Sequence, residues 1–158
     1  MQTRLRLGAE AWPISREAPS RFPILEKIVI QSMHPEGPGT VHLSPDQALY
    51  VHSRLSLVAT AFLHGHNDSV HHLDLPSLPV NHRQEMSRCG AKVWPIGSER
   101  EGETPVLEQV VIESQHPDGD GVIHLTPEQA RYIHGRLTHI TLAFLHENVW
   151  GGEDARDQ

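Results

Sequence analysis

The chain has 158 residues, of which 13 are basic and 20 acidic, giving a formal net charge of −7 with neutral histidines. This balance argues against nucleic acid or an anionic membrane as a partner, because both are bound by basic surfaces. The single cysteine, Cys89, excludes an intrachain disulfide and a cysteine-rich zinc site. No apolar run reaches the length of a membrane span or a signal-peptide core, so we expect a soluble cytoplasmic protein.

One segment of the sequence occurs twice in the chain. Residues 12–64 and 94–146 align without a gap at a constant offset of 82, and 27 of the 53 aligned pairs are identical. Such agreement indicates a tandem duplication, and two copies are too few for a solenoid. We therefore expect a pseudo-twofold pair, equivalent to a homodimer fused into one chain.

Each copy is expected to begin with a β-hairpin. Residues 23–33 are rich in β-branched side chains, and "HPEGPG" supplies a Pro/Gly turn before the short strand "TVHL". The second copy repeats the pattern at 105–115, "HPDGDG" and "VIHL". If Ile30 lies opposite Leu43, one sheet face carries apolar residues and the other carries His42. The apolar face consists of Ile28, Ile30, Val41 and Leu43.

A helix is expected directly after the hairpin. Ser44 supplies an N-cap hydroxyl, Pro45 suits the first helical position, and Gln47 stands three residues after the cap, as a capping box requires. Thr126 begins the same pattern in the second copy, and the helices should run to about residues 64 and 146. Their apolar stripes are Ala48, Val51, Leu55, Val58 and Phe62, and Ala130, Ile133, Leu137, Ile140 and Phe144.

The predicted fold class is α+β. Two β-β-α modules, residues 9–64 and 93–148, are expected to form one pseudo-twofold domain in which a four-stranded antiparallel sheet packs on two helices. A two-stranded module cannot bury enough apolar surface alone, which gives a physical reason for the duplication. Residues 65–92 are expected to form a linker, and residues 149–158 a disordered tail.

The helix start has the same form in both copies. "LSPDQA" at 43–48 and "LTPEQA" at 125–130 follow a short hairpin in each copy. This combination resembles a class of small uncharacterised actinobacterial proteins with an L-[ST]-P-x-Q-A helix start. The resemblance implies a bacterial, cytoplasmic accessory protein, and it brings no activity or ligand.

Histidine is unusually frequent, with 13 in the chain. Neutral imidazole binds Zn, Ni, Cu or Fe, and the candidate metal-binding pair is His42 with His124 on the outward sheet faces. Alternatively, His34 and the other turn histidines are solvated, and those that flank the core stripe are hydrogen-bonded within the fold. No HExxH spacing is present.

The outward side of each helix carries a Tyr-x-His-x-Arg pattern. One interpretation is packing between the copies, with each arginine bonded to an acid of the other copy. The other is a surface that presents two tyrosines and two arginines to an acidic ligand or peptide. The candidate binding residues are Tyr50, His52, Arg54, Tyr132, His134 and Arg136.

No catalytic residue is assigned, since no nucleophile motif or phosphate-binding loop is present. The primary hypothesis is a non-enzymatic binding or regulatory protein that engages a protein or small acidic ligand at the inter-copy surface. The alternative is a histidine-based transition-metal-binding protein, one form of which would be a metal-dependent enzyme. A homodimer is also considered. Equivalent positions that differ would let the two faces recognise unlike partners: Leu57/His139, Leu49/Arg131 and Lys27/Gln109.

Overall fold

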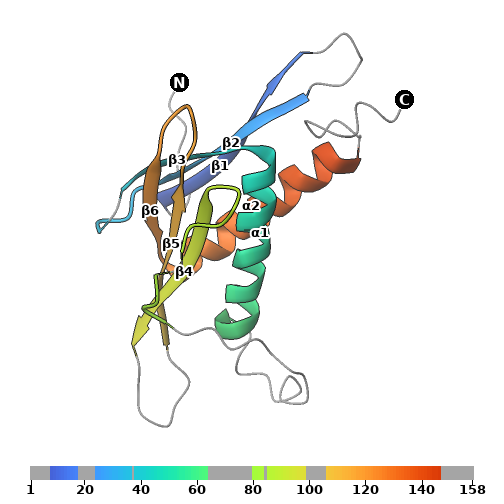
Figure 1. Ribbon diagram of the computed structural model, residues 1–158. Coiled ribbons are helices and arrows are strands. Elements are labelled where there is room, and N and C mark those ends of the chain that lie inside the picture. The colour runs from blue at the N-terminus through green and yellow to red at the C-terminus, as the bar shows by residue number, and fades with distance from the viewer. Residues whose placement is uncertain are drawn as a thin grey trace.

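The computed structural model describes residues 8–17, 24–36, 38–63, 80–83, 85–98 and 106–146. It is an α+β fold with two antiparallel three-stranded sheets and two helices (Figure 1). The first half contains β1 (Ala9–Arg16), β2 (Ile24–Ser32), β3 (Gly39–Leu43), α1 (Pro45–Val58) and the π-helical turn η2 (Ala59–Leu63). The second half contains β4 (Ala91–Ser98), β5 (Val106–Ser114), β6 (Gly121–Leu125) and α2 (Pro127–His146).

The prediction of a single four-stranded sheet is wrong. The strands form two separate sheets in the orders β1-β2-β3 and β4-β5-β6. Each half has a third strand, because the segment around Trp12-Pro13-Ile14 pairs with β2 and its equivalent pairs with β5. β1 and β4 are edge strands, where a proline is tolerated because one side of the strand needs no hydrogen-bonded N–H.

The apolar face of the hairpin was predicted correctly, but its register was not. Ile28 lies opposite Leu43, and Ile30 lies opposite Val41. The expected pairing of Ile30 with Leu43 is therefore shifted by two residues. A shift of two keeps every side chain on its own face, and all four of these residues are fully buried.

The predicted capping box is present at the start of α1. Ser44 is the N-cap, its Oγ accepts a hydrogen bond from Gln47 N at 3.2 Å, and Gln47 Oε1 accepts one from Ser44 N at 2.8 Å. Thr126 and Gln129 form the same pair of bonds at α2. Gln47 also links the halves, since its Nε2 donates to the carbonyl oxygen of Gln115 at 2.6 Å.

Each helix packs on both halves of the chain. α1 lies against β2 of its own half and β4 of the other, while α2 lies against β5 and β1 (Figure 1). The two helices also contact each other. One continuous apolar cluster consequently contains buried residues from all six strands and both helices.

The two sheets meet at their inner edge strands, β3 and β6. A Cβ added to Gly121 would collide with the carbonyl oxygen of Thr40, so the two backbones approach closely here. Ser32 Oγ donates to the carbonyl oxygen of His124 at 2.6 Å, and Ser114 Oγ donates to that of His42 at the same distance. These two bonds join positions that differ by 82 in both donor and acceptor.

Part of the expected linker belongs to the fold. β4 begins at Ala91, and Asn81 sits on the outer edge of β4. Asn81 N donates to the carbonyl oxygen of Pro95 at 2.8 Å, and its side-chain amide exchanges two hydrogen bonds with the backbone of Gly97. Residues 64–79 and the expected tail at 149–158 lie outside the described residues. No helix within the described ranges is long and apolar enough to cross a bilayer.

Candidate functional site

The tyrosine and arginine predicted on the second helix hold a carboxylate of the first half. Tyr132 Oη lies 3.0 and 2.9 Å from the two carboxylate oxygens of Glu10, to which it donates. Arg136 Nε lies 3.2 Å from Glu10 Oε1, and Arg136 Nη2 donates to the carbonyl oxygen of Ala11 at 3.3 Å. This arrangement matches the interpretation in which the arginine bonds an acid of the other copy.

The local geometry explains why these three side chains meet. Tyr132 and Arg136 are four residues apart on α2, so they lie on the same side of the helix. Glu10 alternates with Ala9 and Ala11, which are buried in the core, so its side chain stands on the opposite face of β1. α2 packs against β1, an edge strand of its sheet, and this packing brings Tyr132 and Arg136 to the Glu10 carboxylate.

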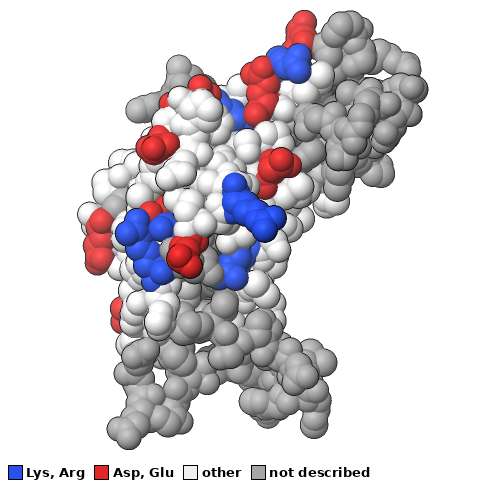
Figure 2. All heavy atoms as spheres, in the orientation of Figure 1, with Lys and Arg blue, Asp and Glu red and all other residues white. Residues whose placement is uncertain are grey.

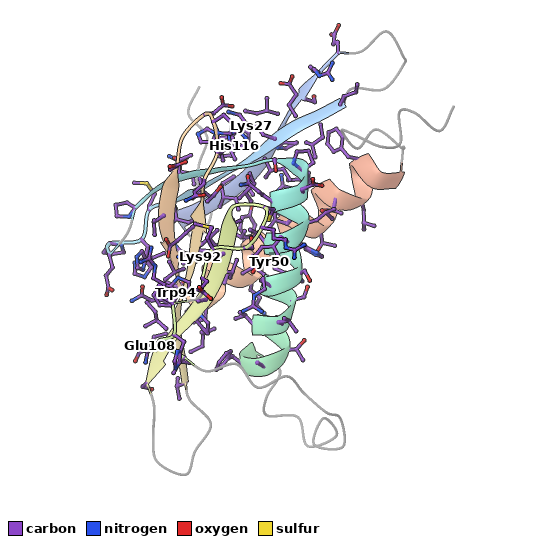
Figure 3. All side chains as sticks on the ribbon, viewed as in Figure 1. Lys27, Tyr50, Lys92, Trp94, Glu108 and His116 are labelled. Atoms are coloured by element: carbon purple, nitrogen blue, oxygen red, sulfur yellow. The ribbon has the colours of Figure 1, made fainter. Side chains whose placement is uncertain are left out.

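The equivalent seam between α1 and β4 has the same helical residues but a different strand residue. Tyr50 and Arg54 occupy the places of Tyr132 and Arg136, and Lys92 occupies the place of Glu10. Figure 3 shows Lys92 on β4 and Tyr50 on α1 at the same level of this seam. We refer to the two as the α1–β4 seam and the α2–β1 seam.

Lys92 forms an ion pair with an acid of its own sheet. Its side chain is 7% exposed, and its Nζ lies 3.7 Å from Glu113 Oε1, on the neighbouring strand. Glu113 also accepts hydrogen bonds from Arg83 Nε at 3.1 Å, from Arg83 Nη2 at 2.9 Å and from Trp94 Nε1 at 3.0 Å. Burial acts to raise the pKa of Glu113, but the hydrogen bonds from Arg83 and Trp94 and the charges of Lys92 and Arg83 outweigh it, so the pKa lies below its usual range.

The two seams therefore differ in charge. Among the described residues, Lys92 of the α1–β4 seam and the nearby Arg83 both lie within 4 Å of the Glu113 carboxylate. In the α2–β1 seam, Arg136 lies against the Glu10 carboxylate. Lys and Arg side chains gather over the middle of the face where α1 and β4 lie (Figure 2).

A surface hollow of about 300 Å³ lies beside this cationic group. Its walls come from β5, β6 and the segment that precedes β4, and they include both members of the Arg83–Glu113 ion pair. The hollow thus adds an open, partly apolar surface next to the charged residues. Its lining residues are Arg83, Met86, Glu113, Ser114, Gln115, Asp120, Gly121 and Val122.

The predicted histidines of the two helices contact each other. The rings of His52 and His134 stack with centroids 4.8 Å apart and an interplanar angle of 2°. His52 Nε2 lies 2.7 Å from Thr138 Oγ1, and His134 Nε2 lies 2.8 Å from Ser56 Oγ. Each hydroxyl already donates its proton to a backbone carbonyl of its own helix, so it accepts from the histidine. Burial lowers the pKa of both histidines, and the charge of His52 lowers that of His134 further.

The predicted metal-binding histidines each lie beside a turn histidine of the other half. The ring centroids of His42 and His116 are 5.9 Å apart, and those of His124 and His34 are 6.1 Å apart. His42 Nδ1 accepts from Lys27 Nζ at 3.0 Å. Within the described part of the chain, no group of three or more His, Cys, Asp or Glu side chains is placed to hold a metal ion. Metal binding therefore stays a prediction.

The substitution Lys27/Gln109 changes the chemistry of these two contacts. Lys27 Nζ donates to Asp118 Oδ2 at 2.8 Å, whereas Gln109 Nε2 donates to Glu36 Oε1 at 2.7 Å. The hydrogen bond and charge of Lys27 hold the pKa of Asp118 below its usual value. Gln109 Oε1 can only accept, so His124 Nδ1 donates to it at 2.7 Å. The contact with the turn acid is thus an ion pair in one half and a hydrogen bond from a neutral amide to a carboxylate in the other.

Comparison with protein-family models and with curated proteins finds no match to this chain. The site is consequently defined by its own geometry.

Sequence reasoning missed Glu10, Lys92, Glu113 and Arg83. The duplication held the signal for two of them, because extending the offset of 82 to Gly8 and Gly90 aligns Glu10 with Lys92. Glu10 and Lys92 have opposite charges at equivalent positions, next to a tyrosine and an arginine that both copies retain. This difference would have indicated that the strand position matters.

Proposed function

We propose that this protein is a non-enzymatic binding protein that recognises an acidic group of a protein or small-molecule partner at the surface between its two halves. The observation that supports this proposal best is the grip of Tyr132 and Arg136 on the Glu10 carboxylate. A tyrosine and an arginine one helical turn apart form a carboxylate-binding pair, and the chain carries this pair twice.

The proposal includes a pseudo-twofold arrangement of the two halves in a single domain. It is supported by contacts that recur at positions 82 residues apart. Ser32 and Ser114 bond reciprocally across β3 and β6, and His52 and His134 have reciprocal hydroxyl partners. Each half supplies the helix that covers the first strand of the other, so the surface between them exists only in the assembled chain.

The chemistry of the pair sets the expected class of ligand. Hydrogen bonds to charged groups contribute about 1.5–3 kcal/mol each, roughly twice as much as neutral ones. A carboxylate bound by tyrosine and arginine therefore gains affinity that an amide of the same shape does not. Both binding and specificity are expected to depend on ionic strength, because salt screens charges that solvent reaches, such as those of Arg136 and Glu10.

Isothermal titration of the full chain with a hexaglutamate peptide tests the proposal, and a hexaglutamine peptide serves as the matched neutral control. We expect hexaglutamate to bind with an affinity that falls as salt is added, and hexaglutamine not to bind. Absence of hexaglutamate binding at low salt, or equal binding of the two peptides, would overturn the proposed function.

A further inference from the structure

We infer that the outer edge of β1, from Pro13 to Arg16, binds an extended segment of a partner protein that presents an asparagine to Ser15, with a small residue before that asparagine. This surface is separate from the tyrosine and arginine pairs of the proposed function and does not depend on them. Its basis is that the second half of the chain already covers its equivalent edge with a segment of this kind.

The equivalent edge, on β4, shows how an asparagine takes the place of a neighbouring strand. Asn81 N donates to the carbonyl oxygen of Pro95 at 2.8 Å, Asn81 Nδ2 donates to the carbonyl oxygen of Gly97 at 2.9 Å, and Asn81 Oδ1 accepts from Gly97 N at 3.2 Å. The carboxamide thus pairs with both backbone groups of Gly97, as the N–H and C=O of a paired strand residue would. Pro95, Gly97 and the adjoining Val80 are all buried.

β1 is the edge strand of the first sheet and has the same pattern as β4. Pro13 and Ser15 lie at the offset of 82 from Pro95 and Gly97, and in both sheets the register shifts directly before the second of these positions. Backbone groups alternate between the two sides of a strand. The carbonyl oxygen of Pro13 and both backbone groups of Ser15 therefore face the outer side of the sheet, as those of Pro95 and Gly97 do.

The start of the β1 edge is closed within the chain, whereas its end is accessible. Ala11 N donates to Glu10 Oε1 at 2.9 Å, and the Ala11 carbonyl oxygen accepts from Arg136 Nη2 at 3.3 Å. Within the described ranges, no hydrogen bond to Ser15 corresponds to those that Asn81 makes on β4. Ser15 is exposed, and the end of β1 extends beyond α1 and away from the rest of the fold (Figure 1). Such an edge is a template for pairing with a strand of another chain.

The residue before the partner's asparagine is expected to be small. Val80 lies beside Gly97, where an added Cβ would be 3.0 Å from Val80 Cγ1 and would collide with the carbonyl oxygen of Val106. Ser15 carries a Cβ, so its backbone is slightly displaced relative to that of Gly97, and a valine before the asparagine would be crowded. Glycine or alanine would fit, and Ser15 thus selects the partner segment by excluding larger residues.

Titration of the 15N-labelled full chain with the peptide acetyl-Leu-Pro-Ala-Asn-His-Arg-amide tests the inference by NMR. The peptide copies residues 78–83 with alanine in place of Val80, and a second peptide with leucine in place of the asparagine is the control. We expect the alanine peptide to shift the backbone amide resonance of Ser15 with a dissociation constant in the millimolar range, because only a few neutral hydrogen bonds form. The leucine control should leave this resonance unchanged.

Ser15→Gly gives the β1 edge the form of the β4 edge and tests the selection of the small residue. We expect this variant to bind the unaltered peptide of residues 78–83, which retains valine, about fivefold more tightly than the wild type does. Ser98→Gly, at the end of β4, is the matched control and should bind as the wild type does. Circular dichroism establishes that both variants are folded.

The outcomes that contradict the inference are equally specific. A Ser15 resonance that does not move at about 10 mM alanine peptide, or that responds equally to the leucine control, would overturn it. Unchanged affinity of Ser15→Gly for the valine peptide would overturn the selection of a small residue. A Ser15 resonance that changes with protein concentration alone would assign the edge to a second copy of the chain, against this inference. None of these results depends on hexaglutamate binding, which tests the proposed function.

Discussion

His52 and His134 stack against each other in nearly parallel planes, each on a different helix and each donating to a hydroxyl group of the opposite helix. The hydroxyl groups of Thr138 and Ser56 each donate a hydrogen bond to a backbone carbonyl of their own helix. The contact is consequently built for two neutral imidazoles that carry their protons on Nε2. A second proton on either ring would place a positive charge directly against the neighbouring ring.

This stack predicts that stability falls in mild acid. The pKa of both histidines in the folded chain lies below the ordinary value of 6.5, so between the folded and unfolded pKa values the unfolded chain binds more protons. The contribution to stability is complete above about pH 6.5 and is lost as the pH falls through the folded pKa values. We expect the urea unfolding midpoint to decrease between about pH 7.5 and 5.

The double variant His52→Gln/His134→Gln separates this pair from the other histidines. Glutamine keeps a donor near the hydroxyl but does not titrate, so the decline in stability with acid should become shallower. Part of the decline will remain, because burial also lowers the pKa of His116. If the pH profiles of the double variant and the wild type run parallel, the stack does not contribute to acid sensitivity.

The two buried serines that join the sheets predict losses of stability on substitution. Ser32→Ala and Ser114→Ala each remove a hydroxyl that donates to a histidine carbonyl of the opposite half. Leaving a buried acceptor without a donor costs about 1–3 kcal/mol in urea unfolding, and Ser32→Ala should cost more than Ser114→Ala because Ser32 Oγ also accepts a hydrogen bond from His34 N at 3.1 Å. Ser53→Ala, at an exposed helical position, should change stability by less than about 0.5 kcal/mol. A loss in Ser114→Ala no larger than that of Ser53→Ala would show that the bond to the His42 carbonyl does not stabilise the fold.

The close approach of β3 and β6 predicts opposite effects for two glycine substitutions. Gly121→Ala places a methyl group against the carbonyl oxygen of Thr40, and we expect a loss of about 1–3 kcal/mol because backbone must move. Gly135→Ala adds the same atoms on α2, where nothing lies within 4 Å, and should stabilise the chain by up to about 1 kcal/mol. Thermal unfolding of the two variants measures the difference, and a neutral Gly121→Ala would contradict the crossing as described.

The exchange of helices between halves predicts that neither half folds as a monomer. A chain that ends at Gly65 carries α1 without β4, and its own β1 lacks the cover of α2. We expect this fragment alone to be unfolded or self-associated, and to become cooperatively folded when mixed with residues 66–158. Sedimentation and circular dichroism distinguish these states. A monomeric fragment with a cooperative thermal transition would contradict the shared core.

Local structure followed closely from the sequence. The capping box at Ser44 and Gln47 depends on residues three apart, so no distant information was needed. The buried face of the hairpin followed from alternation alone, although the register did not, because alternation is equally satisfied by a shift of two residues. β1 was missed because Pro13 interrupts its pattern, and only the edge position in the finished sheet makes that proline acceptable.

The candidate site could be predicted only in part. Tyr132 and Arg136 were recognised from their repeated spacing, together with the possibility that an acid of the other copy binds the arginine. The identity of that acid, Glu10, depends on α2 packing against β1, a contact between residues more than 120 positions apart. Pattern within one segment carries no information on such a contact. The charge reversal at Lys92 gains meaning only after the two seams are compared.

The packing of α1 on β4 also sets a limit on when this protein can fold as it is made. A ribosome that has synthesised α1 has not yet produced the strand that covers it, since β4 begins at Ala91. The apolar side of the newly made helix therefore stays exposed to solvent or bound by another molecule until the second half of the chain leaves the ribosomal exit tunnel. Contacts of such long range form slowly, and unsatisfied apolar surface invites aggregation. We consequently expect chaperones to bind nascent chains that are stalled before β4. Full-length chains released from the ribosome should not bind these chaperones.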